Sequence, residues 1–234
     1  MSNLKQCVIN FGRGSWYPKG QQRMKRLFTE QGYTGDFMLY SDERQLGCKL
    51  HRQNPYAFKA YAFRKAYERG YEIVIWVDCS IHLVKPYQEV LDNILKNKYL
   101  LMLNGWTSGE WCADTALKPL GITREESFTY PHIMACVMGF DLRDSTNLEF
   151  IQEYYDRAAD GVTFPGAWTN DKQQVSNHPK VLGHRHDQTA ASVIAWRLGM
   201  RNFQEYLLYY QDAIDCGAYK IPETALFKNK GGAF

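Results

Sequence analysis

The sequence predicts an α/β fold, a single-domain α/β/α sandwich built around a mostly parallel, mixed sheet. Three observations support this prediction. Segments typical of strands and of helices alternate through the first half of the chain, as they do in βαβ units. The segment EIVIWV (72–77) is continuously apolar, which is typical of a parallel strand covered on both faces. The length of 234 residues is long for one domain but short for two.

The strands expected in the first half are short apolar segments, each followed by polar residues or by glycine. They are QCVINF (6–11), DFMLYS (36–41), EIVIWV (72–77) and YLLMLNG (99–105). In an open parallel sheet, ligands gather at the carboxyl ends of the strands. That rule selects three segments as ligand-binding candidates, namely 12–17, 78–80 and 104–107.

Helices are expected between these strands. The first runs through QQRMKRLFTEQG (21–32) and stops at its final glycine. In the second, Asn54 is expected to cap the helix, with Pro55 at its first position and Gly70 at its end. The third is PYQEVLDNILKN (86–97), whose apolar side chains recur at helical spacing and therefore face the core.

The second half of the chain is less regular. A strand is expected over HIMACVMGFDL (132–142), then a helix over 147–159, and a last helix over 187–199 with Asp187 as its N-cap. The segment 160–186 has no periodicity and is long for an idle connection, so it is a candidate functional loop. The tail from Cys216 is mixed in character, and we expect it to pack loosely.

Composition and charge exclude several classes of function. The net charge is +3, and the basic residues are scattered rather than clustered, so we expect no nucleic-acid partner. No apolar run approaches the ~18 residues of a membrane-spanning helix, and no apolar signal core opens the chain. Six cysteines form no CxxC pair, which favours thiols in a reducing compartment over disulfides or a zinc knuckle. These features predict a soluble, cytoplasmic protein without a transmembrane segment.

The acid Asp78 stands at the end of the most apolar segment of the chain, followed by Cys79 and Ser80. A carboxylate at this place can hold a divalent cation or the hydroxyls of a ribose, and a diphosphate commonly completes the shell of Mg²⁺ or Mn²⁺. The alternative is that Asp78 only ends the strand by capping the following turn, because aspartate is a common turn former.

A second group of candidate site residues is HRHDQ (184–188), directly before an apolar helix. Two histidines beside an acid are compatible with a metal site, and the helix N-terminus favours anions, so Arg185 can face a phosphate. The alternative is a surface loop in which Asp187 merely caps its helix. The density of ionisable residues favours a function here, and we expect this segment to face Asp78.

Other signals are weaker. In FGRGSWYPKG (11–20) the glycines allow close backbone approach to a nucleotide, and Arg13 can reach a phosphate, but the pattern is neither a Walker loop nor a GxGxxG fingerprint. Lys59 is a possible phosphate partner, although an exposed helix lysine is more common. Trp106 and Trp111 can stack on a sugar or simply pack. The chain has no GxSxG and no HExxH, which disfavours hydrolase and zinc-protease functions.

Three segments together resemble nucleotide-sugar glycosyltransferases of the GT-A fold. They are HRQNPYAFKAYAFRKAYERGYEIVIWVDCSI (51–81), MACVMGF (134–140) and HRHDQTAASVIAWRLGM (184–200). The chain is also similar to small viral and bacterial transferases of surface polysaccharides. The resemblance implies one glycosyltransferase-like domain over 1–234, with a nucleotide-binding half at about 1–105 and an acceptor-side half at about 106–234. It implies polysaccharide biosynthesis as the setting.

The resemblance also assigns roles in the donor site. DCS stands where the family has its Asp-x-Asp motif, so Asp78 matches the first acid and Ser80 replaces the second. His184 or His186 matches a histidine that completes the shell of a divalent metal, Mn²⁺ or Mg²⁺, and Ser80 puts tight binding of that metal in doubt. The first loop, with Gly12, Arg13, Gly14 and Tyr17, matches the family's nucleotide-cradling loop, and Asp187 and Gln188 match an acid that lies by the sugar or the acceptor. Lys59 and Arg185 complete the expected donor site as the phosphate candidates named above.

The expected reaction moves a sugar from a nucleoside-diphosphate sugar to a glycan or another hydroxyl acceptor. The charge that grows on the departing diphosphate must be met by a metal or by Arg and Lys. If the reaction inverts the sugar, a carboxylate must accept the acceptor's proton, and Asp187 and Asp114 are the candidates. The alternatives are a non-catalytic module that binds sugar nucleotides or glycans and, less favoured by the N-terminal pattern, a nucleotidyltransferase.

Overall fold

The five residues of strand β3 (Ile73–Val77) are all buried, and the rest of the fold is arranged around them. A computed structural model describes residues 4–230. Its central sheet has the order β2-β1-β3-β6-β5. Strand β1 pairs in parallel with both β2 and β3, whereas β6 pairs antiparallel with both β3 and β5. The bounds of these neighbours are β1 (Gln6–Phe11), β2 (Asp36–Tyr40), β5 (Tyr99–Thr107) and β6 (Pro131–Asp141).

Strand β3 is apolar throughout because both faces of the sheet are covered. Val74 and Trp76 pack into one hydrophobic core, while Ile73, Ile75 and Val77 pack into the other. Successive side chains of a strand point to opposite faces, so each core takes alternate residues. The predicted α/β/α sandwich around a mixed sheet is therefore confirmed.

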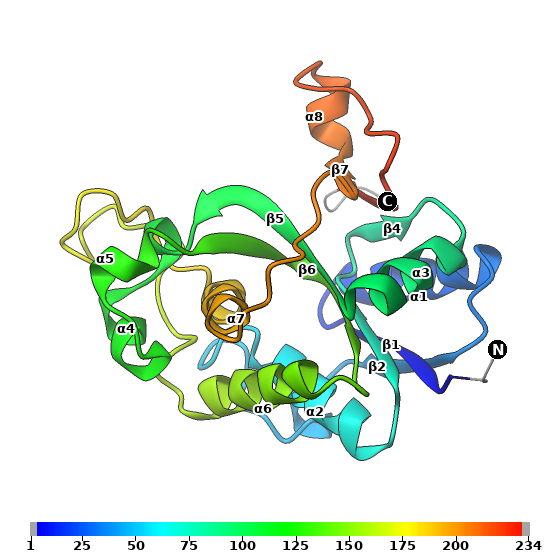
Figure 1. The fold of residues 1–234 in the computed structure, drawn as a ribbon, viewed down its shortest axis with the longest axis horizontal. Helices are drawn as coiled ribbons and strands as arrows, with labels where there is room; N and C mark the ends of the chain where they lie inside the picture. The colour runs from blue at the N-terminus through cyan, green and yellow to red at the C-terminus, as the bar shows by residue number, and fades with distance from the viewer. Residues whose placement is uncertain (1–3, 231–234) are drawn as a thin grey trace.

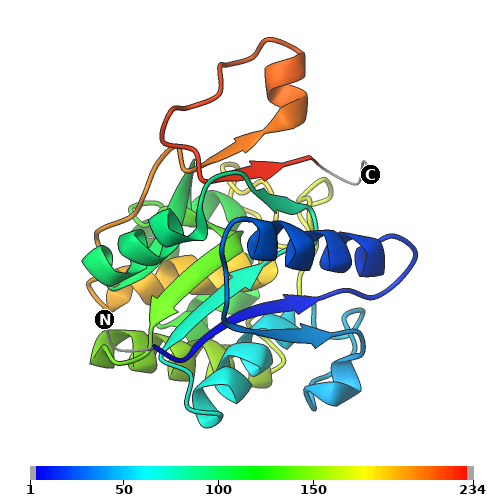
Figure 2. The same cartoon turned by 90° about the vertical axis from the view of Figure 1, so that its right-hand side faces the viewer.

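Helices form the outer layers (Figures 1 and 2). On one face lie α2 (Ala57–Glu68), α6 (Ser145–Ala159) and α7 (His186–Arg197). On the other lie α1 (Tyr17–Glu30) and α3 (Tyr87–Asn97). Two of these helices place residues of the site, because α1 begins just after β1 and α2 lies beneath the end of β3. Short helices complete the chain: η1 (Glu43–Gln45), η2 (Gly109–Trp111), α4 (Asp114–Leu120) and α5 (Arg124–Ser127).

The C-terminal tail is more ordered than its sequence suggests. A second sheet of order β4-β8-β7 joins β4 (Ile81–Leu83), which directly follows the Asp78 turn, to β8 (Phe227–Asn229) and β7 (Leu208–Tyr210). Phe227 is completely buried in the core shared with α1 and α3. The helix α8 (Gln211–Asp215) projects from the body of the molecule (Figures 1 and 2) and has no buried residue. The expectation of loose packing from Cys216 onward is thus wrong for β8, because Phe227 closes the core beside β4.

Two predicted helix caps are wrong. Helix α2 begins at Ala57 after Tyr56, and Asn54 instead donates its side-chain amide to the carbonyl of Ala158 at 2.6 Å. Helix α7 begins at His186 with Arg185 at the N-cap position. Asp187 does not cap α7, because its carboxylate turns inward to the ammonium of a buried lysine, described below.

The ends of β1 and β3 meet because these strands are neighbours. The backbone of Asp78 donates to the carbonyl of Cys136 on β6 at 2.8 Å, which fixes the turn after β3. Helix α1 lies directly against this turn at Gly20, where a Cβ atom would come within 2.7 Å of the carbonyl oxygen of Cys79. A side chain at position 20 would therefore force α1 and the turn apart. Between residues 4 and 230, no helix is both long and apolar enough to cross a membrane.

Candidate functional site

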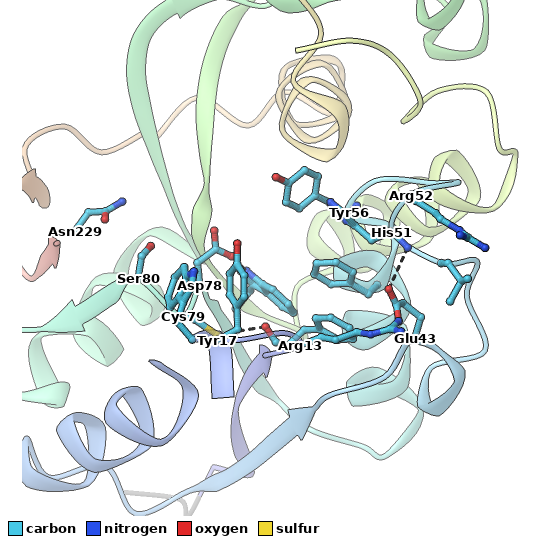
Figure 3. A pocket seen from close by; sticks show the side chains of 15 residues that line it. Arg13, Tyr17, Glu43, His51, Arg52, Tyr56, Asp78, Cys79, Ser80 and Asn229 are labelled. Carbon is cyan, nitrogen blue, oxygen red and sulfur yellow. Dashed lines mark hydrogen bonds and ion pairs between the residues drawn. The ribbon is translucent and has the colours of Figure 1, made fainter. Parts of the chain in front are cut away.

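A pocket of about 770 Å³ opens at the carboxyl ends of β1 and β3. Figure 3 shows Ser80 and Asn229 toward one end of it and His51 and Arg52 toward the other, with Asp78 between them. The pocket is lined by residues of four segments that are distant in sequence, and three of those segments follow strands of the central sheet. The lining residues are Phe11, Arg13, Trp16, Tyr17, Glu43, Leu50, His51, Arg52, Tyr56, Phe58, Trp76, Asp78, Cys79, Ser80 and Asn229.

Asp78 is the acid at the floor of this pocket. Its Oδ1 accepts a 2.6 Å hydrogen bond from the indole Nε1 of Trp76. About a third of its side chain remains exposed, so a ligand in the pocket can reach the carboxylate. An aspartate that only capped a turn would need neither a hydrogen bond from Trp76 nor a position in a pocket. The geometry therefore favours a ligand-binding role for Asp78 over a capping role.

Behind Asp78 lies Lys59, which is 3% exposed and therefore not the surface lysine that is more common on a helix. Its Nζ lies 3.3 Å from Asp78 Oδ1 and 3.1 Å from Asp187 Oδ2, and it donates to the carbonyl of Ala135 at 2.8 Å. The expectation that the HRHDQ segment faces Asp78 is confirmed, because one ammonium joins the two carboxylates.

The burial of this group of charges shifts its pKa values. Burial alone would lower the pKa of Lys59, but Asp187 and Asp78 outweigh it and raise that pKa above its ordinary value. Burial raises the pKa of Asp187 to about 6, against the opposing effect of Lys59. The phenol of Tyr154, 3.4 Å from Asp187 Oδ2, has a raised pKa because it is buried beside that acid. The lysine therefore stays charged at neutral pH.

A second ion pair stands at the wall of the pocket. The Arg13 guanidinium pairs with Glu43, whose carboxylate is buried and also accepts a 3.0 Å hydrogen bond from the backbone of His51. Burial would raise the pKa of Glu43, but the hydrogen bonds from His51 and Arg13 hold it below its ordinary value. An ionised Glu43 therefore anchors Arg13 while half of the Arg13 side chain faces solvent.

Aromatic rings form much of the remaining surface. Phe11 and Phe58 stack with centroids 4.2 Å apart, and Trp16 and Tyr17 stack at 4.0 Å. Tyr56 adopts a left-handed backbone conformation (φ 60°) at the start of α2, which places it at the pocket wall. Flat rings beside an acid and an arginine can bind a nucleobase or a sugar by stacking, with polar groups at the edge.

Both glycines of the first loop are needed, Gly12 for close packing and Gly14 for its backbone conformation. A Cβ atom on Gly12 would come within 3.0 Å of the carbonyl oxygen of Tyr17, and Gly14 has φ +98°. Neither residue lines the pocket through a side chain, but both shape the turn that carries Arg13 and Tyr17 into it. Any other residue at these two positions would disturb the turn, so the two glycines have a structural role in the site.

The predicted metal ligands do not form a metal site in the described chain. His184 is fully buried; its Nδ1 accepts from the backbone of Ala113 at 3.1 Å and its Nε2 lies 2.9 Å from the carbonyl oxygen of Thr163. His186 places Nδ1 2.9 Å from the carbonyl of Phe164. Burial lowers the pKa of His184 to about 3 and that of His186 to about 4. These rings pin the loop over 160–186 to the start of α7.

The donor set therefore does not fit a resident divalent metal. No group of three or more His, Cys, Asp or Glu residues able to hold a metal ion occurs within residues 4–230. Asp78 and Ser80 are the two predicted ligands that line the pocket. The Oδ1 atom of Asp78 is already engaged by Trp76 and Lys59. Mn²⁺ and Mg²⁺ require several oxygen ligands in a fixed geometry, and these residues offer too few.

Three further predicted site residues lie outside the pocket lining. Arg185 is held between the rings of Trp111 and Trp168, with its Cζ 3.8 Å and 4.2 Å from their centroids. Gln188 places Nε2 3.3 Å from Nδ1 of His132. Asp114, at the start of α4, forms an ion pair with Arg124. Lys59 and Asp187 also stand behind the pocket wall rather than on it.

Sequence reasoning missed several pocket residues. Glu43, His51 and Arg52 follow strand β2, so the rule that ligands gather at carboxyl ends of strands could have selected their loop. Tyr56 lies in the segment that carried the family resemblance, but nothing in its local pattern marked it. Asn229 comes from the opposite end of the chain and reaches the pocket only because β8 pairs with β4. No sequence signal indicated that pairing.

Comparisons with known proteins show the fold. No protein-family model matches the chain, and no curated protein resembles it in sequence. Among solved structures it is similar to one described as a "crystal structure of a glycosyltransferase involved in the glycosylation of the major capsid of PBCV-1". The likeness covers 97% of this chain and 95% of that one, with a TM-score of 0.53 and 14% sequence identity. The chain thus has the α/β fold of a glycosyltransferase.

Proposed function

We propose that the protein is a glycosyltransferase of the GT-A type, which moves a sugar from a nucleoside-diphosphate sugar to a glycan or another hydroxyl acceptor. One observation carries the proposal: the pocket at the ends of β1 and β3 contains Asp78, the residue that the sequence resemblance matches to the first acid of the GT-A motif. The similarity to a glycosyltransferase fold along nearly the whole chain supports it.

The pocket offers complementary groups for each part of such a donor. The aromatic rings of Phe11, Tyr17 and Tyr56 provide flat surfaces for the base. The exposed part of Asp78 can accept hydrogen bonds from ribose or sugar hydroxyls. Arg13 and Arg52 line the same pocket and can meet the charge of the diphosphate as it departs.

An aromatic surface beside the pocket supports a glycan as the acceptor. Trp106 and Trp168 are about half exposed, and Trp111 and Arg185 lie between them in one row. Trp106 meets Trp111 edge to face, and the Arg185 guanidinium lies against the rings of Trp111 and Trp168. The row continues to the pocket, because the Trp168 and Tyr56 ring centroids are 6.2 Å apart. Exposed indole faces bind the apolar faces of sugar rings, and a guanidinium adds donors for hydroxyl or carboxylate groups.

The surface is held rigid before any ligand arrives. The backbone of Arg185 donates to the carbonyl of Trp111 at 3.2 Å, and Leu182 donates to that of Glu110 at 2.8 Å. The carboxylate of Glu110 in turn accepts from the backbone of Thr107 at 2.7 Å. A rigid aromatic surface loses little conformational entropy on binding, which favours affinity for a weakly interacting sugar.

The residue that accepts the acceptor's proton stays a proposal with two candidates. Asp187 has a pKa raised to about 6 and lies behind Asp78, bound to Lys59, so an acceptor hydroxyl would need the pocket floor to open. Asp114, on α4, is half exposed but pairs with Arg124 on α5. Neither position is needed as a base if the reaction retains configuration.

The test is a panel of nucleotide sugars, assayed first for binding by calorimetry and then for transfer to oligosaccharide acceptors. We expect one donor to bind one site per chain and to be consumed. The variant Asp78→Asn should keep the fold, because the amide still accepts from Trp76, and should lose transfer by at least about 100-fold. Full activity of this variant would refute the donor-site assignment.

The alternative is a non-catalytic module that binds sugar nucleotides or glycans. It is favoured by one observation, that neither candidate base lines the pocket. Nucleotide-sugar binding by the wild-type chain with no hydrolysis or transfer under any condition would support this module and exclude the enzyme.

A further inference from the structure

A cation, the ammonium of Lys59, lies directly behind Asp78 at the floor of the candidate donor site. It lies 2.8 Å from the carbonyl oxygen of Ala135, 3.1 Å from Asp187 Oδ2 and 3.3 Å from Asp78 Oδ1. An ammonium has three N–H donors, and these three oxygens match them. The group is almost completely buried, behind the rings of Tyr56 and Trp76, whose centroids each lie 5.3 Å from Nζ.

Two carboxylates and a carbonyl that converge on one point are the ligand types that a hard divalent cation prefers. In this chain the point of convergence is the Lys59 nitrogen. A divalent ion bound to Asp78 would have to share that carboxylate with a fixed positive charge, and the second acid of the GT-A motif is replaced by Ser80. The repulsion between two neighbouring cations in a water-poor site is large.

We propose that Lys59 is the built-in cation of this site, so that the protein binds its donor without a divalent metal. The ammonium neutralises Asp78, and the carboxylate then serves as a hydrogen-bond acceptor for donor hydroxyls rather than as a metal ligand. Arg13 and Arg52 meet the diphosphate. The inference rests on the proposed function only for the identity of the bound anion, the diphosphate of a nucleotide sugar. The exclusion of a divalent metal by Lys59 rests on the geometry alone.

The same geometry gives a sharp consequence. Removing the lysine side chain leaves the Asp78 and Asp187 carboxylates and the Ala135 carbonyl facing an emptied volume. The variant Lys59→Ala should therefore gain a divalent cation site of oxygen ligands. The matched variant Lys59→Met also removes the charge but fills the volume with a side chain of similar length, and it should gain no such site.

The decisive experiment is a Mn²⁺ titration of each chain, followed by the electron paramagnetic resonance signal of free Mn²⁺. Circular dichroism first establishes that each variant is folded. We expect no stoichiometric uptake by the wild type or by Lys59→Met, and uptake of one ion per chain by Lys59→Ala at least tenfold tighter than any wild-type binding. One tight Mn²⁺ per wild-type chain that disappears in Asp78→Asn would overturn the proposal. A folded Lys59→Ala chain without uptake would also count against it.

Donor binding separates this inference from the proposed function. Calorimetry with the nucleotide-sugar panel is run in EDTA and in Mn²⁺, and we expect affinities that agree within about threefold. Binding that requires Mn²⁺ would overturn the built-in cation while leaving the glycosyltransferase proposal intact. If no nucleotide sugar binds under either condition, the proposed function fails, and the Mn²⁺ titration alone then decides the role of Lys59.

Discussion

At the scale of single residues, the account depends on a lysine whose sequence context gave no warning of its position. Lys59 occurs in AFKAYAF, a pattern that a surface lysine would fit equally well. Asp78 could be selected from sequence, because a charge at the end of an apolar strand needs an explanation. Lys59 was named only as a possible phosphate partner, and its position between Asp78 and Asp187 could not be predicted, because Asp187 lies 128 positions further along the chain. Lys59 and Asp187 meet through packing: α2 packs against α6 and the sheet, and α6 packs against α7. Tertiary contacts of this kind leave no local sequence pattern.

The first prediction concerns the stability of this buried group. Lys59→Met leaves Asp187 and Asp78 without their cation and should lower the free energy of unfolding by about 3–5 kcal/mol, measured by urea denaturation. The exposed lysine of α3 provides a control, since Lys96→Met should change it by no more than about 0.5 kcal/mol. Adding Asp187→Asn to Lys59→Met should recover part of the loss, because it removes the unpaired buried charge. Equal effects of the two lysine substitutions would contradict the buried ion group.

A second prediction concerns the acceptor surface. Trp168→Ala removes a half-exposed indole from the row beside the pocket, and we expect the KM for a glycan acceptor to rise by about tenfold, or about 1.4 kcal/mol. Donor affinity should stay the same, because Trp168 does not line the pocket. The exposed Tyr219 on the C-terminal projection serves as the control, and Tyr219→Ala should leave both constants unchanged. If Trp168→Ala lowered the donor affinity and left the KM for the acceptor unchanged, the aromatic row would belong to the donor site, and its assignment to the acceptor would be wrong.

At the scale of elements, the order of strands and helices was largely predictable and their exact starts were not. The burial of β3 followed from its apolar run, and the helices followed from periodicity. The cap at Asn54 was wrong because a tertiary hydrogen bond to Ala158 outweighed its local preference. The small sheet of β4, β8 and β7 could not be foreseen, since pairing between strands of three residues depends on where the rest of the fold brings them.

The contact between α1 and the Asp78 turn gives a prediction at this scale. Alanine normally favours a helix over glycine by about 1 kcal/mol, yet Gly20→Ala should destabilise the protein by about 1–3 kcal/mol, because the new Cβ meets the Cys79 carbonyl. It should also weaken donor binding by displacing the turn that carries Asp78. The matched substitution Gln22→Ala, at an exposed position of the same helix, should change neither quantity. A stabilised Gly20→Ala protein would show that the helix and turn are not in contact.

At the scale of the whole molecule, buried histidines couple the fold to pH. Burial lowers the pKa of His132 and His184 to about 3 and that of His186 to about 4. Their folded pKa values lie below the unfolded value of about 6.5, so the unfolded chain binds protons that the folded chain does not. The contribution of the neutral histidines to the free energy of unfolding is therefore fully present above about pH 6.5, and it is lost as the pH falls below that value. Asp187, with its pKa raised to about 6, opposes this with one proton.

Burial also lowers the pKa of His82 to about 4, so the histidines outweigh the one acid. The unfolded chain therefore takes up more protons than the folded chain between pH 7 and pH 5, and the free energy of unfolding falls with pH over this range. Thermal melts between pH 7.5 and 5 should therefore show a steadily falling Tm. A Tm that is constant over this range would mean that these rings are not buried in the neutral form, and that the loop over 160–186 is not pinned by them.

The most direct test of the central claim is a crystal structure of the chain with its preferred nucleoside-diphosphate sugar, grown in the presence of EDTA. The account predicts the donor in the pocket at the ends of β1 and β3. There its hydroxyls would bond to the Asp78 carboxylate and its diphosphate would lie near Arg13, with the Lys59 ammonium still joining Asp78 to Asp187. A donor bound on another face of the molecule, under conditions in which calorimetry shows saturation, would contradict it.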